Sequence, residues 1–169
     1  QFERQLRWLE RWGADGGRRV LDVGCGAAAF IPFAQGVGWV VEGTDVVVTD
    51  AARATGARMW EGQLPSIAFG DECYDVVRFN HVLEHTQDPI AELRAARSRL
   101  TKGGLLHVGV PNLAGLSITL KSWQSRLNLK RKSWKHYGAL HHLWFFTPQT
   151  LARLVEAAGF DVIGWETPV

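Results

Sequence analysis

Residues 19–29 read Arg-Val-Leu-Asp-Val-Gly-Cys-Gly-Ala-Ala-Ala, and this stretch decides the fold. Its first part, 19–23, is mostly apolar and is typical of a buried parallel strand. Gly24 and Gly26 then form a tight turn in which the backbone can come close to a ligand. The turn leads into a helix predicted over 27–37. A strand that passes through a glycine turn into a helix predicts the first unit of a doubly wound α/β sheet.

The rest of the chain repeats this alternation of strand and helix. Short aliphatic runs alternate with stretches whose apolar residues recur at helical spacing. The alternation predicts a Rossmann-like, mostly parallel sheet with helices on both faces, and such sheets bind ligands at the carboxyl ends of their strands. The predicted strands are 19–23, 39–44, 58–61, 74–79, 105–110 and 160–165, and the predicted helices are 2–12, 27–37, 48–55, 89–100, 113–127 and 148–158.

Composition places the chain among ordinary globular proteins. Of its 169 residues, 46% are hydrophobic and 21% are charged. No run of 18 apolar residues predicts a membrane-spanning helix. The two cysteines are too few for a disulfide framework, and with no visible signal peptide they favour a cytoplasmic location. We expect a single domain over 1–169, because no linker divides the chain.

The charges are unevenly distributed along the chain. Residues 1–92 carry 8 Lys/Arg and 14 Asp/Glu, whereas 93–155 carry 11 Lys/Arg and no carboxylate. Within this basic stretch, apolar spacing predicts an amphipathic helix in an insertion at about 112–146. We expect the insertion to be a lid over a ligand pocket. The alternatives are contact of 113–135 with a membrane surface or lipid-linked substrate, and recognition of an anionic small molecule. We do not expect nucleic acid, because no RNA-binding motif accompanies the charge.

Two carboxylates near the glycine turn indicate its ligand. Asp22 precedes Gly24, where it would be unfavourable beside a pyrophosphate but suits a cationic amine, such as the ammonium group of S-adenosylmethionine. Asp45 follows Gly24 by 21 residues, near the spacing of a carboxylate that binds ribose hydroxyls. Ala29 stands where a dinucleotide motif has its third glycine. The pattern favours S-adenosylmethionine. The alternatives are a dinucleotide enzyme and a purely structural glycine turn.

The series of motifs closely resembles class I S-adenosylmethionine-dependent methyltransferases. The closest likeness is to the broad bacterial group that includes the ubiquinone-biosynthesis O-methyltransferases. It implies methyl transfer to an O, N or C nucleophile of a small molecule, with S-adenosylhomocysteine as product. The motifs that carry the resemblance are 20–26, 43–45, 74–77, 81–85 followed by 88–89, 100–104, 110–112, and 142–148 running into 158–160.

The resemblance also implies which residues contact the cofactor. The turn at 24–26 and Asp22 line the methionine portion, Asp45 meets the ribose, and the turn at 62–64 borders the adenine. The end of the strand at 74–79 lies beside the methyl donor. The expected cofactor residues are Asp22, Gly24, Cys25, Gly26, Asp45, Val46, Gly62, Gln63, Leu64, Asn80 and His81.

Three histidines are candidates for catalysis. The sulfonium donor is already activated, so the enzyme mainly positions the acceptor and removes its proton. His81 and His85 share one face of a turn with Glu84, and histidine titrates near neutral pH. His142 precedes the last helix, in a segment that folds over the site in similar enzymes. The alternative for Glu84 and His85 is loop architecture, and for His142 a structural role.

We assign no metal ligand from the sequence. In the ubiquinone O-methyltransferases a related segment, with Glu in the place of His81, is thought to hold a divalent metal. Glu84 and His85 match that segment, whereas His81 departs from it. The sequence therefore leaves metal dependence open.

Two other departures suggest an alternative function. The group usually has glycine where this chain has Ala28. The group also ends with a seventh, antiparallel strand, which we expect to be missing from this chain. Both departures suggest the alternative of a methyltransferase-fold module that binds cofactor weakly or not at all and serves as a partner domain.

Overall fold

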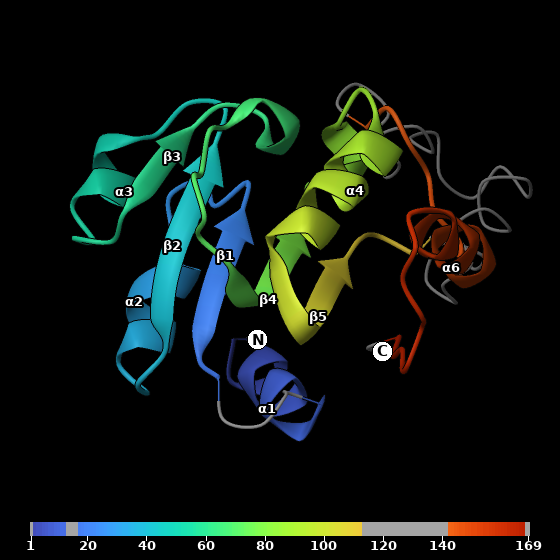
Figure 1. The fold of residues 1–169 in the computed structure, drawn as a ribbon, viewed down its shortest axis with the longest axis horizontal. Coiled ribbons are helices and arrows are strands. Elements are labelled where there is room, and N and C mark those ends of the chain that lie inside the picture. The colour runs from blue at the N-terminus through green and yellow to red at the C-terminus, as the bar shows by residue number, and fades with distance from the viewer. Residues whose placement is uncertain (1, 13–16, 113–141, 168–169) are drawn as a thin grey trace, which may run out of the picture.

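The computed structural model describes residues 2–12, 17–112 and 142–167. Its centre is a parallel sheet in the order β3-β2-β1-β4-β5 (Figure 1). The chain builds the sheet outward from β1 in one direction and then crosses to β4 and builds in the other. This confirms the predicted doubly wound topology. The strands are β1 (Arg19–Val23), β2 (Val40–Asp45), β3 (Met59–Glu61), β4 (Tyr74–Asn80) and β5 (Leu100–Gly109).

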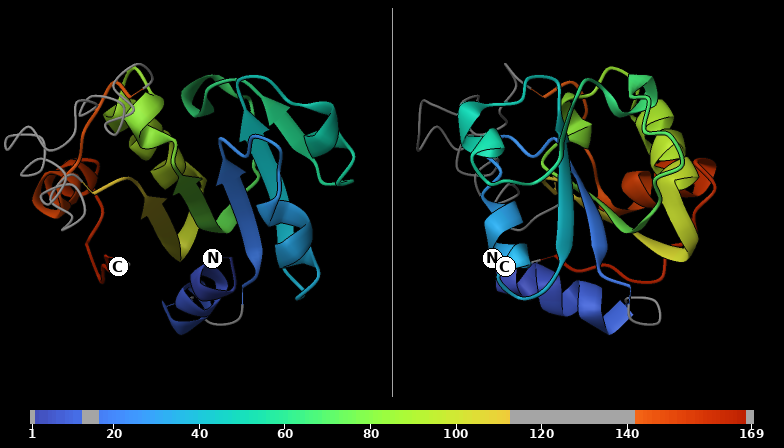
Figure 2. Two further views of the ribbon diagram at one scale, coloured as in Figure 1. Left: turned by 180° about the vertical axis from the view of Figure 1, so that it is seen from behind. Right: turned by 60° about the vertical axis from the view of Figure 1, so that its left-hand side comes forward.

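Helices cover both faces of the sheet. In the right-hand view of Figure 2, α1 and α2 lie on one side of the sheet, and α4 and α6 lie on the other. The helices are α1 (Phe2–Trp12), α2 (Phe30–Gln35), α3 (Asp50–Arg53), α4 (Pro89–Arg99) and α6 (Pro148–Ala157), and two short 3-10 turns are η1 (Leu64–Ser66) and η2 (Leu83–His85).

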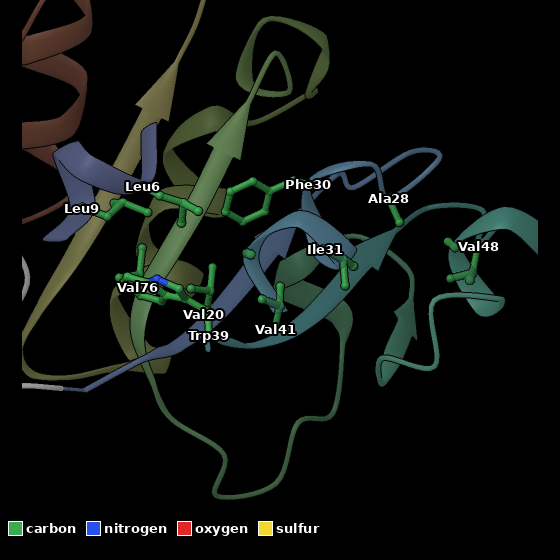
Figure 3. Packing of buried hydrophobic residues seen from close by; sticks show 12 residues of the cluster. Leu6, Leu9, Val20, Ala28, Phe30, Ile31, Trp39, Val41, Val48 and Val76 are labelled. Atoms are coloured by element: carbon green, nitrogen blue, oxygen red, sulfur yellow. The ribbon is translucent and has the colours of Figure 1, made fainter. Parts of the chain in front are cut away.

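Two apolar cores result, one on each face. The first packs Leu6 and Leu9 of α1 and Phe30 and Ile31 of α2 against Val20 and its neighbours (Figure 3). The second packs α4 and the segment around α6 against the opposite face. Neighbouring residues of β1 and β4 alternate between the two cores, as the twofold repeat of a strand requires.

Helix starts follow the local sequence. The Asp88 side chain accepts hydrogen bonds from Ile90 N and Ala91 N at the start of α4. Thr147 and Thr150 form a reciprocal capping box at the start of α6. In both helices proline occupies the first turn, where its missing N–H costs nothing. The predicted helices at 89–100 and 148–158 are therefore confirmed to within a residue.

Other predicted boundaries were wrong by several residues. The helix predicted over 27–37 forms only at Phe30–Gln35, because Ala28 has φ +58 and prolongs the turn after β1. The helix predicted over 48–55 shortens to Asp50–Arg53, since Thr49 caps its start. β5 begins at Leu100 instead of 105, with an irregular register beside Tyr74 and Val76.

The strand predicted over 160–165 does not form. Residues 161–167 have no regular structure. Val162, Ile163 and Trp165 are 41%, 51% and 69% exposed. A strand needs a partner for its backbone hydrogen bonds, and the described strands offer none to this segment. Its apolar composition alone predicted the wrong state.

The basic insertion lies largely outside the described residues. This applies to the predicted helix 113–127, to the proposed membrane contact 113–135, and to all but the ends of the predicted lid. Asn112 and Phe146 form an isolated parallel bridge, so the chain leaves and re-enters the described part at one place. No helix in the described residues is long and apolar enough to cross a membrane.

Candidate functional site

The glycine turn follows β1 at the carboxyl edge of the sheet. Gly24 and Gly26 have φ values of +65 and +56, a region that favours glycine. A Cβ on Gly24 would lie 2.5 Å from Val82 Cγ2, whereas a Cβ on Gly26 would meet no atom within 4 Å. Gly24 is thus required by packing, and Gly26 leaves its backbone open to a ligand.

Asp45 joins three of the predicted cofactor turns. Its Oδ2 accepts a hydrogen bond from Gly26 N at 2.8 Å. Its backbone oxygen accepts one from Gly62 N, also at 2.8 Å. Val46, the next residue, is 60% exposed. The structure therefore brings Gly26, Asp45, Val46 and Gly62 together, although they are far apart in the sequence.

The turn after β3 presents mostly backbone. Gly62 has φ +135, and Gln63 is exposed. Leu64 is 3% exposed and belongs to the core that faces α4. Glu92 of α4 holds this turn, because its carboxylate accepts a hydrogen bond from the Leu64 backbone. The Leu64 side chain is thus committed to packing, which leaves its backbone for any ligand contact.

Asp22 is committed to a partner that sequence reasoning missed. Its carboxylate is 1% exposed and accepts a hydrogen bond from Arg78 Nη1 of β4 at 2.5 Å. Burial raises the pKa of Asp22, against the opposing effect of Arg78. The missed signal was an arginine inside the otherwise apolar strand Val76-Val77-Arg78-Phe79. Such a charge needs a buried partner.

Helix α1 extends this network to the end of β4. Gln5 accepts a hydrogen bond from Arg78 Nη2 at 2.8 Å and donates one from Nε2 to Asn80 Oδ1 at 2.8 Å. Gly109 of β5 lies against Asn80, since a Cβ there would come within 2.9 Å of Asn80 Oδ1. Gln5 is therefore a second residue that the sequence did not single out. Together these contacts fix Asn80 at the carboxyl edge.

His81 stands in a strained turn directly after β4. Its φ is +59, in the left-handed region that few residues other than glycine adopt, although histidine, like Asn and Asp, is enriched there. Its backbone N–H donates to Gly109 O at 2.7 Å, and this bond helps to hold the turn. Such outliers occur preferentially at functional sites.

A buried carboxylate lies among the predicted catalytic histidines. Glu84 is 1% exposed, and His81 Nδ1 and His85 Nε2 lie 3.4 and 4.0 Å from its Oε1. The rings of His85 and His142 pack edge to face with centroids 4.7 Å apart. The Glu84 carboxylate raises the pKa of His81. The structure therefore brings together all three histidines, of which the first two were expected to share a turn.

Backbone contacts hold the His142 segment against η2. Leu143 N and Trp144 N both donate to Glu84 O, at 2.7 and 3.1 Å. Trp144 Nε1 donates to Thr86 O at 2.8 Å. A groove of about 490 Å³ opens beside this junction, and it is lined by the start of α4, α6 and the aromatic residues 144–146.

The same cluster has the donor set of a metal site. Glu84, His85 and His142 each offer one ligand atom, and these atoms lie within 4.8 Å of one another. Neither oxygen of Glu84 accepts a well-formed hydrogen bond from the described part of the chain. A buried carboxylate in this state costs free energy unless a cation compensates it. These residues therefore fit a divalent cation.

Comparison with known proteins identifies relatives of this architecture. Residues 2–164 match the profile of a family described as a methyltransferase domain. The ubiquinone biosynthesis O-methyltransferase of Cereibacter sphaeroides is 32% identical, over 87% of this chain and 62% of its own length. That of Thiobacillus denitrificans is 29% identical, over 93% of this chain and 70% of its own length. The chain thus spans less than two thirds of the first of these relatives.

Solved structures share the fold. The magnesium protoporphyrin IX methyltransferase of Synechocystis, solved with bound S-adenosylhomocysteine, superposes with a TM-score of 0.69. The alignment covers 95% of this chain and 72% of that one, at 17% identity. At this identity the likeness establishes the fold alone.

Proposed function

Because this chain belongs to the methyltransferase domain family, we propose that it binds S-adenosylmethionine and transfers its methyl group to a small-molecule acceptor. The acceptor atom is an O, N or C nucleophile. The observation that carries the proposal is the position of Asp45, which ties the turns at Gly26 and Gly62 together at the carboxyl edge of the sheet. Ligands of doubly wound sheets bind at this edge.

The residue roles follow from this arrangement. Asp45 accepts the ribose hydroxyls, and the 24–26 turn contacts the methionine portion. Val46 and the backbone of 62–64 border the adenine, and Asn80 lies beside the methyl group. Asp22 acts through Arg78 and Gln5 on Asn80 rather than by direct contact, since its carboxylate is buried in that network.

The histidine cluster is placed to act on the acceptor. His81 is half-exposed, follows Asn80 directly and is paired with Glu84 through Nδ1. Its other nitrogen, Nε2, would accept the proton of the acceptor as the methyl group is transferred. His85 and His142, whose rings pack against each other beside Glu84, would position the acceptor.

Calorimetric titration of the purified chain with S-adenosylmethionine, S-adenosylhomocysteine and NAD tests the cofactor. We expect micromolar binding of the two sulfur nucleotides, no binding of NAD, and loss of binding in Asp45→Ala. The control is Asp71→Ala, because Asp71 is an exposed acid in the loop before β4. Binding of NAD, or of no nucleotide, would overturn the proposal.

A partner domain without catalysis is a second candidate function. The engagement of Asp22 with Arg78 favours it, because this carboxylate is not free to meet a methionine ammonium. The buried, left-handed Ala28 is consistent with it. The same titration distinguishes the two, since a partner domain would bind neither sulfur nucleotide.

We further propose a cytoplasmic enzyme whose segment 113–135 contacts anionic membranes or a lipid-linked acceptor. The support is the run of 11 cations without a carboxylate over 93–155, with tryptophans interspersed, a composition that suits the interfacial zone. Flotation with anionic liposomes at low salt tests this. Failure to float would leave a solvated lid as the role of the segment.

A further inference from the structure

We propose that Gln5 of α1 fixes the orientation of the Asn80 side-chain amide, so that the amide nitrogen donates a hydrogen bond to the carboxylate of the cofactor. This carboxylate belongs to the methionine portion of S-adenosylmethionine. The inference rests on the proposed function and adds to it the group that Asn80 recognises and the residue that positions Asn80. Gln5 and Asn80 are 75 residues apart, so only the fold relates them.

The first argument is the order of donors and acceptors that begins at Arg78. A guanidinium group donates hydrogen bonds and accepts none. Arg78 Nη2 donates to Gln5 Oε1 at 2.8 Å, so the oxygen of the Gln5 amide must face the arginine. The nitrogen of the same amide is left for Asn80, and it donates to Asn80 Oδ1 at 2.8 Å. The donor-only chemistry of Arg78 therefore sets the orientation of both amides.

The second argument is that this order starts from a fixed group. Arg78 is 4% exposed, pairs with Asp22, and lies 4.0 Å from the centroid of the Phe30 ring. If the Gln5 amide turned, its NH₂ group would face the guanidinium. If the Asn80 amide turned, two NH₂ groups would face each other. Either change would leave a part-buried donor unpaired, which costs free energy, so the orientation is set before a ligand binds.

The third argument is the direction in which the Asn80 nitrogen faces. Asn80 ends β4, which lies between β1 and β5. Its Oδ1 lies on the β5 side, since a Cβ on Gly109 would come within 2.9 Å of it. The nitrogen of a planar amide lies on the other side of Cγ, so Nδ2 faces β1 and the turn at 24–26 that follows it. Asn80 is half-buried, and within the described part of the chain Nδ2 donates to no protein group. The nitrogen is therefore available to a ligand.

The fourth argument is the chemistry of the ligand. The proposed function places the methionine portion at the turn at 24–26, and this portion carries a carboxylate that needs hydrogen-bond donors. Asp22 and Asp45 beside the turn are acids, and Arg78 already donates to Asp22 and Gln5. The Asn80 amide nitrogen is a donor that remains available there. Hydrogen bonds to an ionised carboxylate are stronger than those between neutral groups, whereas an amide oxygen in the same place would repel it.

The test is calorimetric titration with S-adenosylhomocysteine and with S-adenosyl-3-thiopropylamine, which lacks only the carboxylate. The parent should bind S-adenosylhomocysteine at least about tenfold more tightly than this analogue. Asn80→Leu keeps a side chain of similar size without the N–H donor. It should weaken S-adenosylhomocysteine binding by at least about tenfold and change the Kd of the analogue by less than about threefold.

Two variants of Gln5 test its positioning role. Gln5→Glu still accepts from Arg78, but its second oxygen also accepts, so Asn80 must turn its nitrogen away from the ligand. Gln5→Met removes both hydrogen bonds and leaves the Asn80 amide free to turn, which should weaken S-adenosylhomocysteine binding by only about two- to fivefold. Gln5→Glu should therefore bind S-adenosylhomocysteine more weakly than Gln5→Met, although it should be the more stable of the two in thermal unfolding. A merely structural role would give the same order in both measurements.

Gln35→Glu controls for the added charge, because Gln35 is exposed at the end of α2. It should bind both ligands as the parent does. Thermal unfolding establishes that each variant is folded before titration, and Asn80→Ala replaces Asn80→Leu if that variant does not fold.

Three results would overturn this inference and leave the proposed function intact. They are equal affinity of the parent for the two ligands, an equal loss of both ligands in Asn80→Leu, and weaker S-adenosylhomocysteine binding in Gln5→Met than in Gln5→Glu. Failure of the parent to bind S-adenosylhomocysteine would overturn the proposed function, and this inference with it.

Discussion

Asp22 and Arg78 occupy paired positions on the neighbouring strands β1 and β4, and their side chains form a buried ion pair. The two side chains are 2% and 4% exposed. The Arg78 guanidinium also lies 4.0 Å from the centroid of the Phe30 ring and donates to Gln5. The pair therefore connects α1 and α2 to the strand that leads into the glycine turn.

Removing only the arginine should be strongly destabilising. In Arg78→Met the carboxylate of Asp22 stays buried without a partner, which typically costs about 3–5 kcal/mol. The double variant Asp22→Asn/Arg78→Met should be more stable than Arg78→Met alone, because no uncompensated charge is left. Urea unfolding of both variants and the parent measures this. A double variant no more stable than Arg78→Met would show that the pair is not what stabilises this region.

The two turn glycines should respond differently to alanine. Gly24→Ala places a methyl group 2.5 Å from Val82, so it should destabilise the fold by about 2 kcal/mol or more. Gly26→Ala meets open space and should cost only the roughly 1 kcal/mol of a left-handed alanine. Gly26→Ala should nevertheless weaken the binding of S-adenosylmethionine, because the methyl group of the new alanine would occupy space that the ligand needs. Unfolding and calorimetric titration of both variants separate the effects. Unchanged affinity in Gly26→Ala would place the cofactor elsewhere.

The two cysteines should differ in reactivity. Burial, with the charges of Asp22 and Asp45, raises the pKa of Cys25 to about 12, and the thiolate is the reactive form. Cys73 is exposed. At pH 8 iodoacetamide should modify Cys73 at least about tenfold faster than Cys25. Peptide mass spectrometry over time measures both rates, with Cys73→Ser as the control. Comparable rates would mean that the turn around Cys25 is open in solution.

Glu92 should make stability depend on pH. Burial raises the pKa of the Glu92 carboxyl well above its ordinary value, to about 7. The folded state therefore holds a proton that the unfolded state releases. The resulting stabilisation of the folded state is complete below about pH 4.5 and is lost as pH rises through 7. Between pH 5 and pH 8, the free energy of unfolding of Glu92→Gln should rise by about 1–3 kcal/mol relative to that of the parent.

Urea unfolding of the parent and Glu92→Gln at the two pH values tests this dependence. The exposed Glu156 of α6 supplies the control Glu156→Gln, which should follow the parent at both pH values. A difference between Glu92→Gln and the parent that does not change with pH would contradict the raised pKa.

The amino-acid sequence by itself determined the fold class and the family. Buried strands such as 19–23 and 74–79 are nearly continuous apolar runs, and caps such as Asp88-Pro89 and Thr147-Pro148 act over one turn of helix. These signals are local, so they can be read without a structure. The same local reading failed at 160–165, because a strand depends on a partner that lies elsewhere in the chain.

Only the tertiary structure decided which polar groups meet. Asp22 and Arg78 are 56 residues apart, and Glu84 and His142 are 58 apart, and no spacing rule links either pair. Strand register placed the first pair side by side, and the backbone bonds from Leu143 and Trp144 placed the second. Buried polar groups must find partners within the fold, and the packing of distant segments determines which partners are within reach.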